Sequence, residues 1–443
     1  MLKKSQTFGV LLLFLGSTFC TSQKFVNETN TPKHYFVVIM LLVILLFIVI
    51  IKKRICIGML SSKRMLWGIN IICFIQACYG ISQFIGWLQP NNSNFEVTGS
   101  FDNPAGFAAV LSLGFPIGLS LLNKAKKIEC YLTVAGLTVI TMAIFLSGSR
   151  AGMLAMIVSS GAFLLATKNM LSNVRHFKYY KLVLFFLSGL LIGGALILYY
   201  QKKDSADGRL LIWKVSSEMI KDKPVFGHGY GKFLAKYMDY QAEYFKSNSN
   251  SKFELLADNV KHPFNEFIKV TVEFGIAGLV ITFSLMLFIF RKIIKSKHEN
   301  SELVLSGLAS FLVFACFSYP LQYVAAWLLL AFYLSIFLLS KEITLKNIPI
   351  SIIASGIIII ACVFSLFYIF KQMSAEIKWK TIALNSLGGN TEEMLPEYKK
   401  LYSTVLRRNP FFLYNFGAEL NIAGRFDRSI EVLNECQRQF QTS

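Results

Sequence analysis

Residues 129–167 read ECYLTVAGLTVITMAIFLSGSRAGMLAMIVSSGAFLLAT. Two apolar runs lie on either side of the short turn SGSR, and the turn carries one charged side chain, Arg150. A helix of about 20 residues crosses the roughly 30 Å of hydrocarbon in a bilayer. This stretch therefore predicts two membrane-spanning helices joined by a short loop.

The same pattern recurs along the chain. Of its 443 residues, 54% are hydrophobic and only 16% are charged, and the mean hydropathy is +0.52. Soluble domains carry about 25% charged residues, so a soluble or disordered chain is excluded. We predict an all-α polytopic membrane protein with about 11 transmembrane helices. The first apolar run is either a span or a signal peptide. The approximate limits of the runs are 7–22, 35–51, 65–88, 103–122, 129–146, 151–167, 182–200, 267–290, 303–319, 321–340 and 348–370.

The net charge of +20 is distributed unevenly over the loops. If the N-terminus is cytoplasmic, the short outside loops carry only Lys24, Lys33 and Arg150. Such an excess of inside positive charge orients membrane proteins, so no nucleic-acid partner is needed to explain the charge. The loop 201–266 and the tail 371–443 are then external. The inside segments carry twenty positive residues: Lys3, Lys4, Lys52, Lys53, Arg54, Lys63, Arg64, Lys124, Lys126, Lys127, Lys168, Arg175, Lys178, Lys181, Arg291, Lys292, Lys295, Lys297, Lys341 and Lys346.

The tail predicts a second domain, residues 371–443, after a membrane domain of residues 1–370. Residues 409–440 read NPFFLYNFGAELNIAGRFDRSIEVLNECQRQF and resemble a tetratricopeptide repeat. Gly417 takes the small position of the first helix, and Leu433 packs from the second. A generic helical hairpin is the alternative. One repeat cannot bury its own apolar face, so a weaker helical pair is expected before it, around 376–406.

Two polar clusters mark the external ends of the fourth and fifth spans. In GSFDNPAGF, Asp102 or Asn103 can cap a helix whose first turn holds Pro104. In SGSRAG, Arg150 stands between small residues. An arginine there either snorkels to lipid phosphate or binds a phosphate ligand with its bidentate fork.

Two further clusters lie on the external loop 201–266. An amphipathic helix carries Arg209 and Trp213 one turn apart, and the GHGYG that follows is interpreted as a structural turn. In KHPFNEF, His262 precedes Asn265 where the eighth span begins. A histidine at that place is either structural or a general base, with Asn265 near enough to orient the ring or the acceptor.

The order NP, SR, R-x-x-x-W, P-x-x-G-x-G, H-x-x-N and G-x-x-G resembles the O-antigen ligase and polymerase superfamily, which includes bacterial protein oligosaccharyltransferases. The resemblance covers roughly residues 65–340. It implies a multi-pass protein of the bacterial inner membrane, with its active face and tail in the periplasm. It also implies a glycosyltransferase without metal or other cofactor, whose donor is a glycan on undecaprenyl diphosphate.

By this resemblance, Arg150 and Arg209 grip the diphosphate and His262 is the catalytic histidine. We assign Asn103, Trp213 and Asn265 to substrate binding. Many members have a histidine directly before the asparagine, where this chain has Phe264. The expected acceptor is lipid A–core, with a second lipid-linked repeat unit or a protein hydroxyl as alternatives.

The residues fit this chemistry independently. An acceptor hydroxyl that displaces a lipid diphosphate needs fixed cations beside the leaving group. The chain has no Asp-x-Asp pair, no CxxC pair and no Cys/His cluster with zinc spacing, which leaves the arginines. Two other classes remain open: a transporter of lipid-linked glycans within the membrane lipids, and a scaffold whose tail binds an envelope protein.

Overall fold

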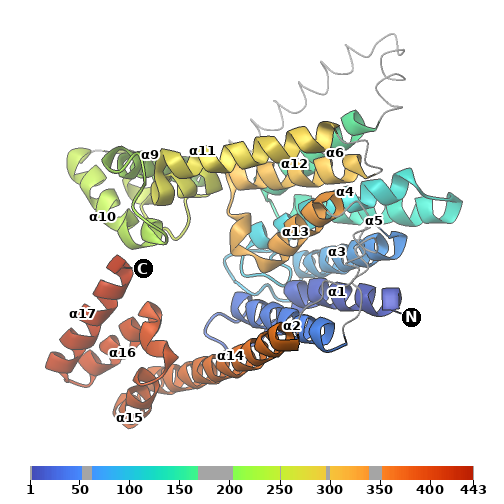
Figure 1. Cartoon of the computed structure of the whole chain (residues 1–443). Coiled ribbons are helices and arrows are strands. Elements are labelled where there is room, and N and C mark those ends of the chain that lie inside the picture. Colours follow the sequence, from blue (N-terminus) through green and yellow to red (C-terminus); the bar gives the residue numbers. More distant parts are fainter. Residues whose placement is uncertain are drawn as a thin grey trace. The chain divides into compact units, whose positions relative to one another are not determined.

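The computed structural model describes residues 2–51, 62–167, 203–249, 251–295, 300–338 and 352–442. Every regular element in these residues is a helix, which confirms the all-α prediction (Figure 1). The predicted span 182–200 lies outside the described residues. The chain divides into two compact units, one of residues 58–341 and one of residues 1–57 with 342–443. The domain boundary predicted at residue 370 stays a prediction.

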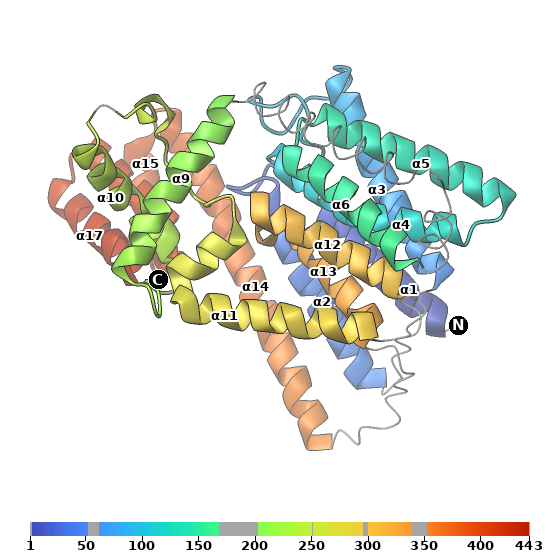
Figure 2. The same ribbon diagram turned by 90° about the horizontal axis from the view of Figure 1, so that it is seen from above.

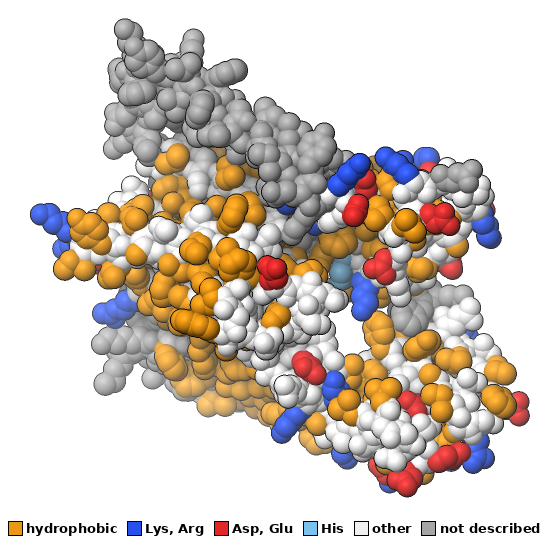
Figure 3. All heavy atoms as spheres, turned by 180° about the vertical axis from the view of Figure 1, so that it is seen from behind, with side chains coloured by type: hydrophobic (Ala, Val, Ile, Leu, Met, Phe, Trp, Pro, Cys, Tyr) orange, Lys and Arg blue, Asp and Glu red, His pale blue; other side chains and the backbone are white. Residues whose placement is uncertain are grey.

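The described helices support a multi-pass membrane protein. Hydrophobic side chains cover much of the molecular face in Figure 3. The count of eleven crossings stays a prediction, because only some helices reach the length that a crossing needs. Six are long and apolar enough: α2 (Asn30–Ile51), α3 (Lys63–Phe84), α4 (Pro104–Asn123), α5 (Lys127–Leu146), α11 (Glu266–Lys295) and α14 (Ile352–Leu387). Four apolar helical stretches are shorter: Thr7–Phe19 within α1 (Leu2–Phe19), α6 (Arg150–Ala166), α12 (Ser301–Phe317) and α13 (Val324–Leu338).

Helix α4 is the centre of the 58–341 unit. It packs against α3, α5, α6, α12 and α13, and almost its whole length is buried. Its glycines make room for neighbouring side chains. A Cβ at Gly106 would lie 2.5 Å from the ring of Tyr323, and one at Gly114 would lie 2.3 Å from Sγ of Cys73. Small residues of this kind let membrane helices approach closely.

The predicted loop 201–266 contains two helices, α9 (Lys203–Asp222) and α10 (Lys232–Ser247). Both lie beside the first turns of α11 (Figure 2). The amphipathic helix that the sequence predicts around Arg209 and Trp213 is α9. Burial of its apolar face stabilises the loop as a small folded layer. The shared core consists of Leu211, Ile212, Val215, Met219, Phe233, Tyr237, Phe253 and Val272.

Helix α11 is interrupted at Gly275, where the backbone is non-helical with φ 67° and ψ −168°. The segment 224–229 crosses the interruption and pairs with it through the backbone. The amides of His228 and Gly229 donate to the carbonyls of Val272 and Glu273 at 2.9 and 2.8 Å. Two further bonds run the other way, from the amides of Ile276 and Ala277 to the carbonyls of Pro224 and Val225 at 2.8 and 3.1 Å.

Buried polar groups reinforce this crossing. The Glu273 carboxylate accepts the amides of Gly231 and Phe233, where α10 begins. The Nε2 atom of His228 lies 2.8 Å from the carbonyl oxygen of Met219, and its ring packs edge-on against Tyr240. The interpretation of GHGYG as a structural turn agrees with these contacts.

The tail is a helical layer within the other unit. The last turns of α14 pack with α15 (Thr391–Tyr402), α16 (Pro410–Ile422) and α17 (Phe426–Thr442). A Cβ at Gly417 would lie 2.6 Å from Leu433, and the Ser429 hydroxyl donates to the Gly417 carbonyl at 2.7 Å. The predicted close contact of two helices at Gly417 is therefore present. The tetratricopeptide assignment itself stays a prediction.

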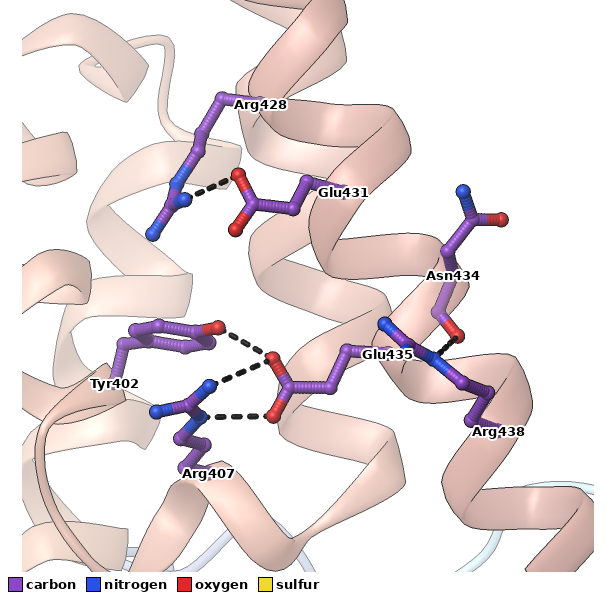
Figure 4. Close-up of polar contacts among 7 residues, drawn as sticks. All are labelled: Tyr402, Arg407, Arg428, Glu431, Asn434, Glu435 and Arg438. Carbon is purple, nitrogen blue, oxygen red and sulfur yellow. Dashed lines mark hydrogen bonds and ion pairs between the residues drawn. The ribbon is translucent and has the colours of Figure 1, made fainter.

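A polar cluster ties α17 to the rest of this layer (Figure 4). The Arg407 guanidinium donates to both carboxylate oxygens of Glu435, at 2.8 and 3.3 Å, and the Tyr402 hydroxyl donates to the same carboxylate. The guanidinium also lies 4.7 Å from the centre of the Tyr402 ring. This bidentate ion pair, with the Tyr402 ring beside it, fixes the orientation of α17 relative to the end of α15.

We expect Gly275→Ala to destabilise the protein. A Cβ there would lie 2.1 Å from the Val225 carbonyl oxygen, and the positive φ disfavours any other residue. Overpacking of this kind costs about 1–3 kcal/mol, which should lower the melting temperature by several degrees in detergent solution. Gly161→Ala is the matched control, since a Cβ at that helical position meets nothing within 4 Å. Equal melting temperatures for the two variants would contradict the backbone crossing.

Candidate active site

The NP motif forms the start of α4. Oδ1 of Asn103 accepts the amide of Ala105 at 2.8 Å, and Pro104 is the first helical residue. The capping role considered for Asp102 or Asn103 thus belongs to Asn103. The loop before it is held by Gln83, whose Oε1 accepts the amides at positions 98 and 99 at 3.0 and 2.7 Å. This end of α4 is therefore a rigid edge for whatever lies beside it.

Arg150 is the first residue of α6. Gly148 turns the chain with φ 62°, and the Ser149 hydroxyl caps the helix by accepting the amide of Gly152 at 3.2 Å. The guanidinium extends from this turn and donates from Nη2 to the hydroxyl of Ser205 at 3.2 Å. Ser205 belongs to the first turn of α9, so Arg150 connects the membrane helices to the loop layer.

Arg209 follows on α9, one turn later. Its Nη1 donates to the carbonyl of Phe317 at 2.9 Å, and its Cζ lies 4.9 Å from the centre of the Phe264 ring. Burial lowers the pKa of the Arg209 guanidinium to about 10, and the positive charge of Arg150 contributes to the lowering. Arg209 is therefore charged at neutral pH and close enough to Arg150 for the two guanidinium groups to repel each other. An anion between them would relieve that repulsion.

Trp213 fixes the loop that carries the histidine motif. Its indole Nε1 donates to the carbonyl of Pro263 at 2.8 Å. Trp213 lies one turn after Arg209 on the same helix. One face of α9 therefore contacts both Pro263 and Phe264. The hydrogen bond gives Trp213 a structural role, and the predicted substrate contact stays a prediction.

His262 lies in that loop with its ring stacked on Tyr319. The ring centres are 4.7 Å apart and the planes differ by 23°. Burial lowers the pKa of His262 to about 4, and the positive charges of Lys269 and Lys261 add to the effect. The imidazole is thus neutral at physiological pH. Because an unfolded histidine titrates near 6.5, we expect folding stability to fall as the pH drops from about 6.5 to 4.

Phe264 stands directly before Asn265, where many members of the superfamily that the motifs resemble have a histidine. It has φ 54°, and among the described residues it is the one non-glycine residue with a positive φ. Its ring meets Tyr319 edge-on at 5.1 Å and lies beneath the Arg209 guanidinium. Strained backbone of this kind persists where the surroundings impose it, and it concentrates at functional sites.

Asn265 caps the next helix. Its Oδ1 accepts the amides of Phe267 and Ile268 at 2.9 and 3.0 Å, in the first turn of α11. The oxygen considered for orienting His262 or the acceptor is therefore bonded to backbone. The beginning of α11 is fixed a second time by Glu266, whose Oε1 accepts the amide of Leu321 at 3.0 Å.

The sequence analysis did not identify residues 317–323, which run from the last residue of α12 to the residue before α13. They provide the Phe317 carbonyl for Arg209, the Tyr319 ring for His262 and the Leu321 amide for Glu266. The signal in the sequence was the pair Tyr319 and Tyr323, which lies between two apolar runs. Composition alone does not distinguish such a pair from an ordinary turn at the membrane interface. The structure thus places Arg209 near Arg150 on one side and, on the other, against Phe264, whose ring shares the neighbour Tyr319 with His262. Within the described residues, no three His, Cys, Asp or Glu side chains gather as metal ligands would.

The chain is similar to known proteins in part of its length. Residues 135–283, about a third of the chain, match a protein family described as O-Antigen ligase. Two relatives carry the name "Putative polysaccharide ligase". The one from Rickettsia typhi is 27% identical over 106 residues, and the one from Rickettsia felis is 28% identical over 102. Each match covers 23% of this chain and 24% of the relative, so the chain spans about a quarter of the length of these relatives. The region that matches the family, residues 135–283, includes Arg150, Arg209 and His262, and these similarities support the superfamily suggested by the motifs.

We expect Asn265→Ala to lower stability by about 1 kcal/mol, the usual cost of losing an N-cap. Asn265→Asp should retain stability, because it keeps the oxygen that accepts the two amides. Thermal unfolding of both variants in detergent measures this. Comparable losses in both variants would show that the amide nitrogen of Asn265 contributes to stability, and would contradict capping by the oxygen as the main role of this residue.

Proposed function

We propose that this protein is a membrane glycosyltransferase that moves a glycan from undecaprenyl diphosphate to an acceptor hydroxyl at the periplasmic face of the bacterial inner membrane. The preferred acceptor is lipid A–core, which makes the reaction O-antigen ligation. The observation that supports it best is the pair of neighbouring guanidinium groups, Arg150 and Arg209, with Arg209 packed on Phe264 in the loop that carries His262. Glycan ligation in the broad sense agrees with the similarity to polysaccharide ligases.

The arginines would bind the diphosphate. Arg209 approaches from α9 and Arg150 from α6, so the anion would lie between the loop layer and the membrane helices. Charge-assisted hydrogen bonds from a fixed guanidinium are about twice as strong as neutral ones. As the bond between the anomeric carbon and the phosphate oxygen breaks, negative charge develops on the diphosphate. Donors already in place stabilise this charge without reorganisation.

His262 would act on the acceptor. The acceptor oxygen forms a bond to the anomeric carbon, the lipid diphosphate leaves, and the acceptor proton passes to the imidazole. A neutral ring can accept this proton, and the low pKa of His262 keeps it neutral down to about pH 4. A weak base of this kind assists late, when the oxygen has begun to carry positive charge.

A transfer assay with membranes identifies the acceptor. Membranes supplied with a lipid-linked glycan should transfer it to lipid A–core, in preference to a second lipid-linked repeat unit or a protein. A deletion strain should accumulate polymer on the lipid carrier and none on lipid A. If the polymer on the lipid carrier is longer in the wild type than in the deletion strain, the repeat-unit polymerase is favoured instead.

We expect Arg150→Lys and Arg209→Lys each to reduce transfer on the order of 10²-fold, because a lysine cannot replace the bidentate fork. Transfer should persist in EDTA if the arginines carry the diphosphate without a metal ion. Arg425→Lys is the control: it makes the same change on an exposed side chain of the tail. Inhibition by EDTA that magnesium reverses would refute this assignment.

We expect His262→Ala to lower kcat by about 10²–10⁴-fold, while binding of the lipid-linked donor is retained. In the wild type, kcat/KM should fall with acidity near pH 4, where His262 gains its proton, and stay level around pH 6.5. His228→Ala is the matched change, and it should lower the melting temperature with less effect on transfer, because that ring bonds the Met219 carbonyl. Normal transfer by His262→Ala would mean that another residue is the base.

A further inference from the structure

Tyr319 is surrounded by aromatic rings. His262 stacks on it at 4.7 Å, Tyr323 stacks on it at 5.8 Å with 29° between the planes, and Phe264 meets it edge-on at 5.1 Å. These neighbours come from two separate parts of the chain, the histidine loop and the start of α13. Contacts between rings at such separations prefer particular orientations, so each ring limits the freedom of the others.

The far side of this stack is fixed by backbone. The Tyr323 hydroxyl lies near the Gly106 amide and near the Tyr319 hydroxyl. Phe101 also meets the Tyr323 ring edge-on at 5.6 Å. Because a Cβ at Gly106 would overlap the Tyr323 ring, the glycine is required for this contact. The orientation of Tyr319 is therefore set by the capped end of α4.

His262 depends on the stack for its own orientation. Among the described residues the imidazole makes no hydrogen bond, so its plane is set by the face of Tyr319. The charged and titratable groups around it are Lys261 and Lys269 from its own segment, Tyr319 itself and, across Phe264, Arg209. Asp102 lies close to the tyrosine hydroxyls and influences Tyr319 electrostatically.

We propose that Tyr319 is the positioning residue for His262: its aromatic face, aligned by Tyr323 and the start of α4, holds the imidazole in the plane and the dry surroundings that the reaction requires. The role rests on the ring, and the hydroxyl only aligns it. The consequence for transfer rests on the proposed function, whereas the placement of the imidazole can be tested without any transfer assay.

The test compares Tyr319→Phe, which keeps the aromatic face, with Tyr319→Leu, which removes it. Histidine-labelled full-length protein in detergent micelles is titrated by NMR, and the signal lost in His262→Gln identifies the ring. We expect a midpoint near pH 4 in the wild type and in Tyr319→Phe. In Tyr319→Leu the midpoint should rise towards 6.5, because water reaches the imidazole. Should Tyr319→Leu fail to fold, Tyr319→Met provides similar volume without a planar face.

Transfer kinetics give the second readout. Tyr319→Leu should lower kcat on the order of 10²-fold with little change in the KM for the donor, since the arginines are untouched. Tyr319→Phe should restore kcat to within about threefold. An unchanged midpoint in Tyr319→Leu, or equal loss in both variants, would overturn the proposal. If the wild type transfers no glycan, the proposed function fails, and the NMR titration still decides whether Tyr319 positions His262.

Discussion

The backbone crossing at Gly275 is the constraint on which the arrangement of the site depends. Two chain segments approach so closely that neither Gly227 nor Gly275 has room for a Cβ. Four backbone hydrogen bonds close the crossing, and they fix the end of α9 against the first turns of α11. Arg209 reaches the site from one of these helices and His262 from the loop before the other. Their separation is therefore set by main-chain geometry, which varies less than side-chain packing.

Electrostatics gives this arrangement its chemical character. Arg150 and Arg209 stand close together, and the contacts described for them are a hydroxyl, a carbonyl and an aromatic ring. Two guanidinium groups that lie near each other repel, and this repulsion favours the binding of an anion beside them.

Local rules predicted much of this from the sequence. Hydropathy placed the apolar helices, and capping preferences placed Asn103 and Pro104 at the start of α4. Those rules act between near neighbours in the chain. The sequence did not predict the role of Tyr319, because His262 and Phe264, which contact it, are distant in sequence. An aromatic residue beside a span is also ordinarily an interfacial anchor. The capping role of Asn265 was not predicted either, although an asparagine directly before a helix is a preferred N-cap. The short helices α6, α12 and α13 show why hydropathy alone does not fix the number of crossings.

Helix α14 joins membrane and tail without a break over 36 residues, about 54 Å at the usual rise. Its only glycine is Gly356, near the start, and it contains no proline. Two contacts hold its second half. The Tyr35 hydroxyl of α2 donates to Glu376 of α14, and Lys380 of α14 donates to Glu28, which lies before α2. The continuous helix therefore fixes the direction in which the tail faces relative to the membrane-spanning part of α14. One residue inserted between them would rotate the tail by about 100° around the helix axis. An insertion of five full turns, or about 18 residues, would restore the direction of the tail. The length of this helix can therefore change without turning the tail only by whole numbers of turns.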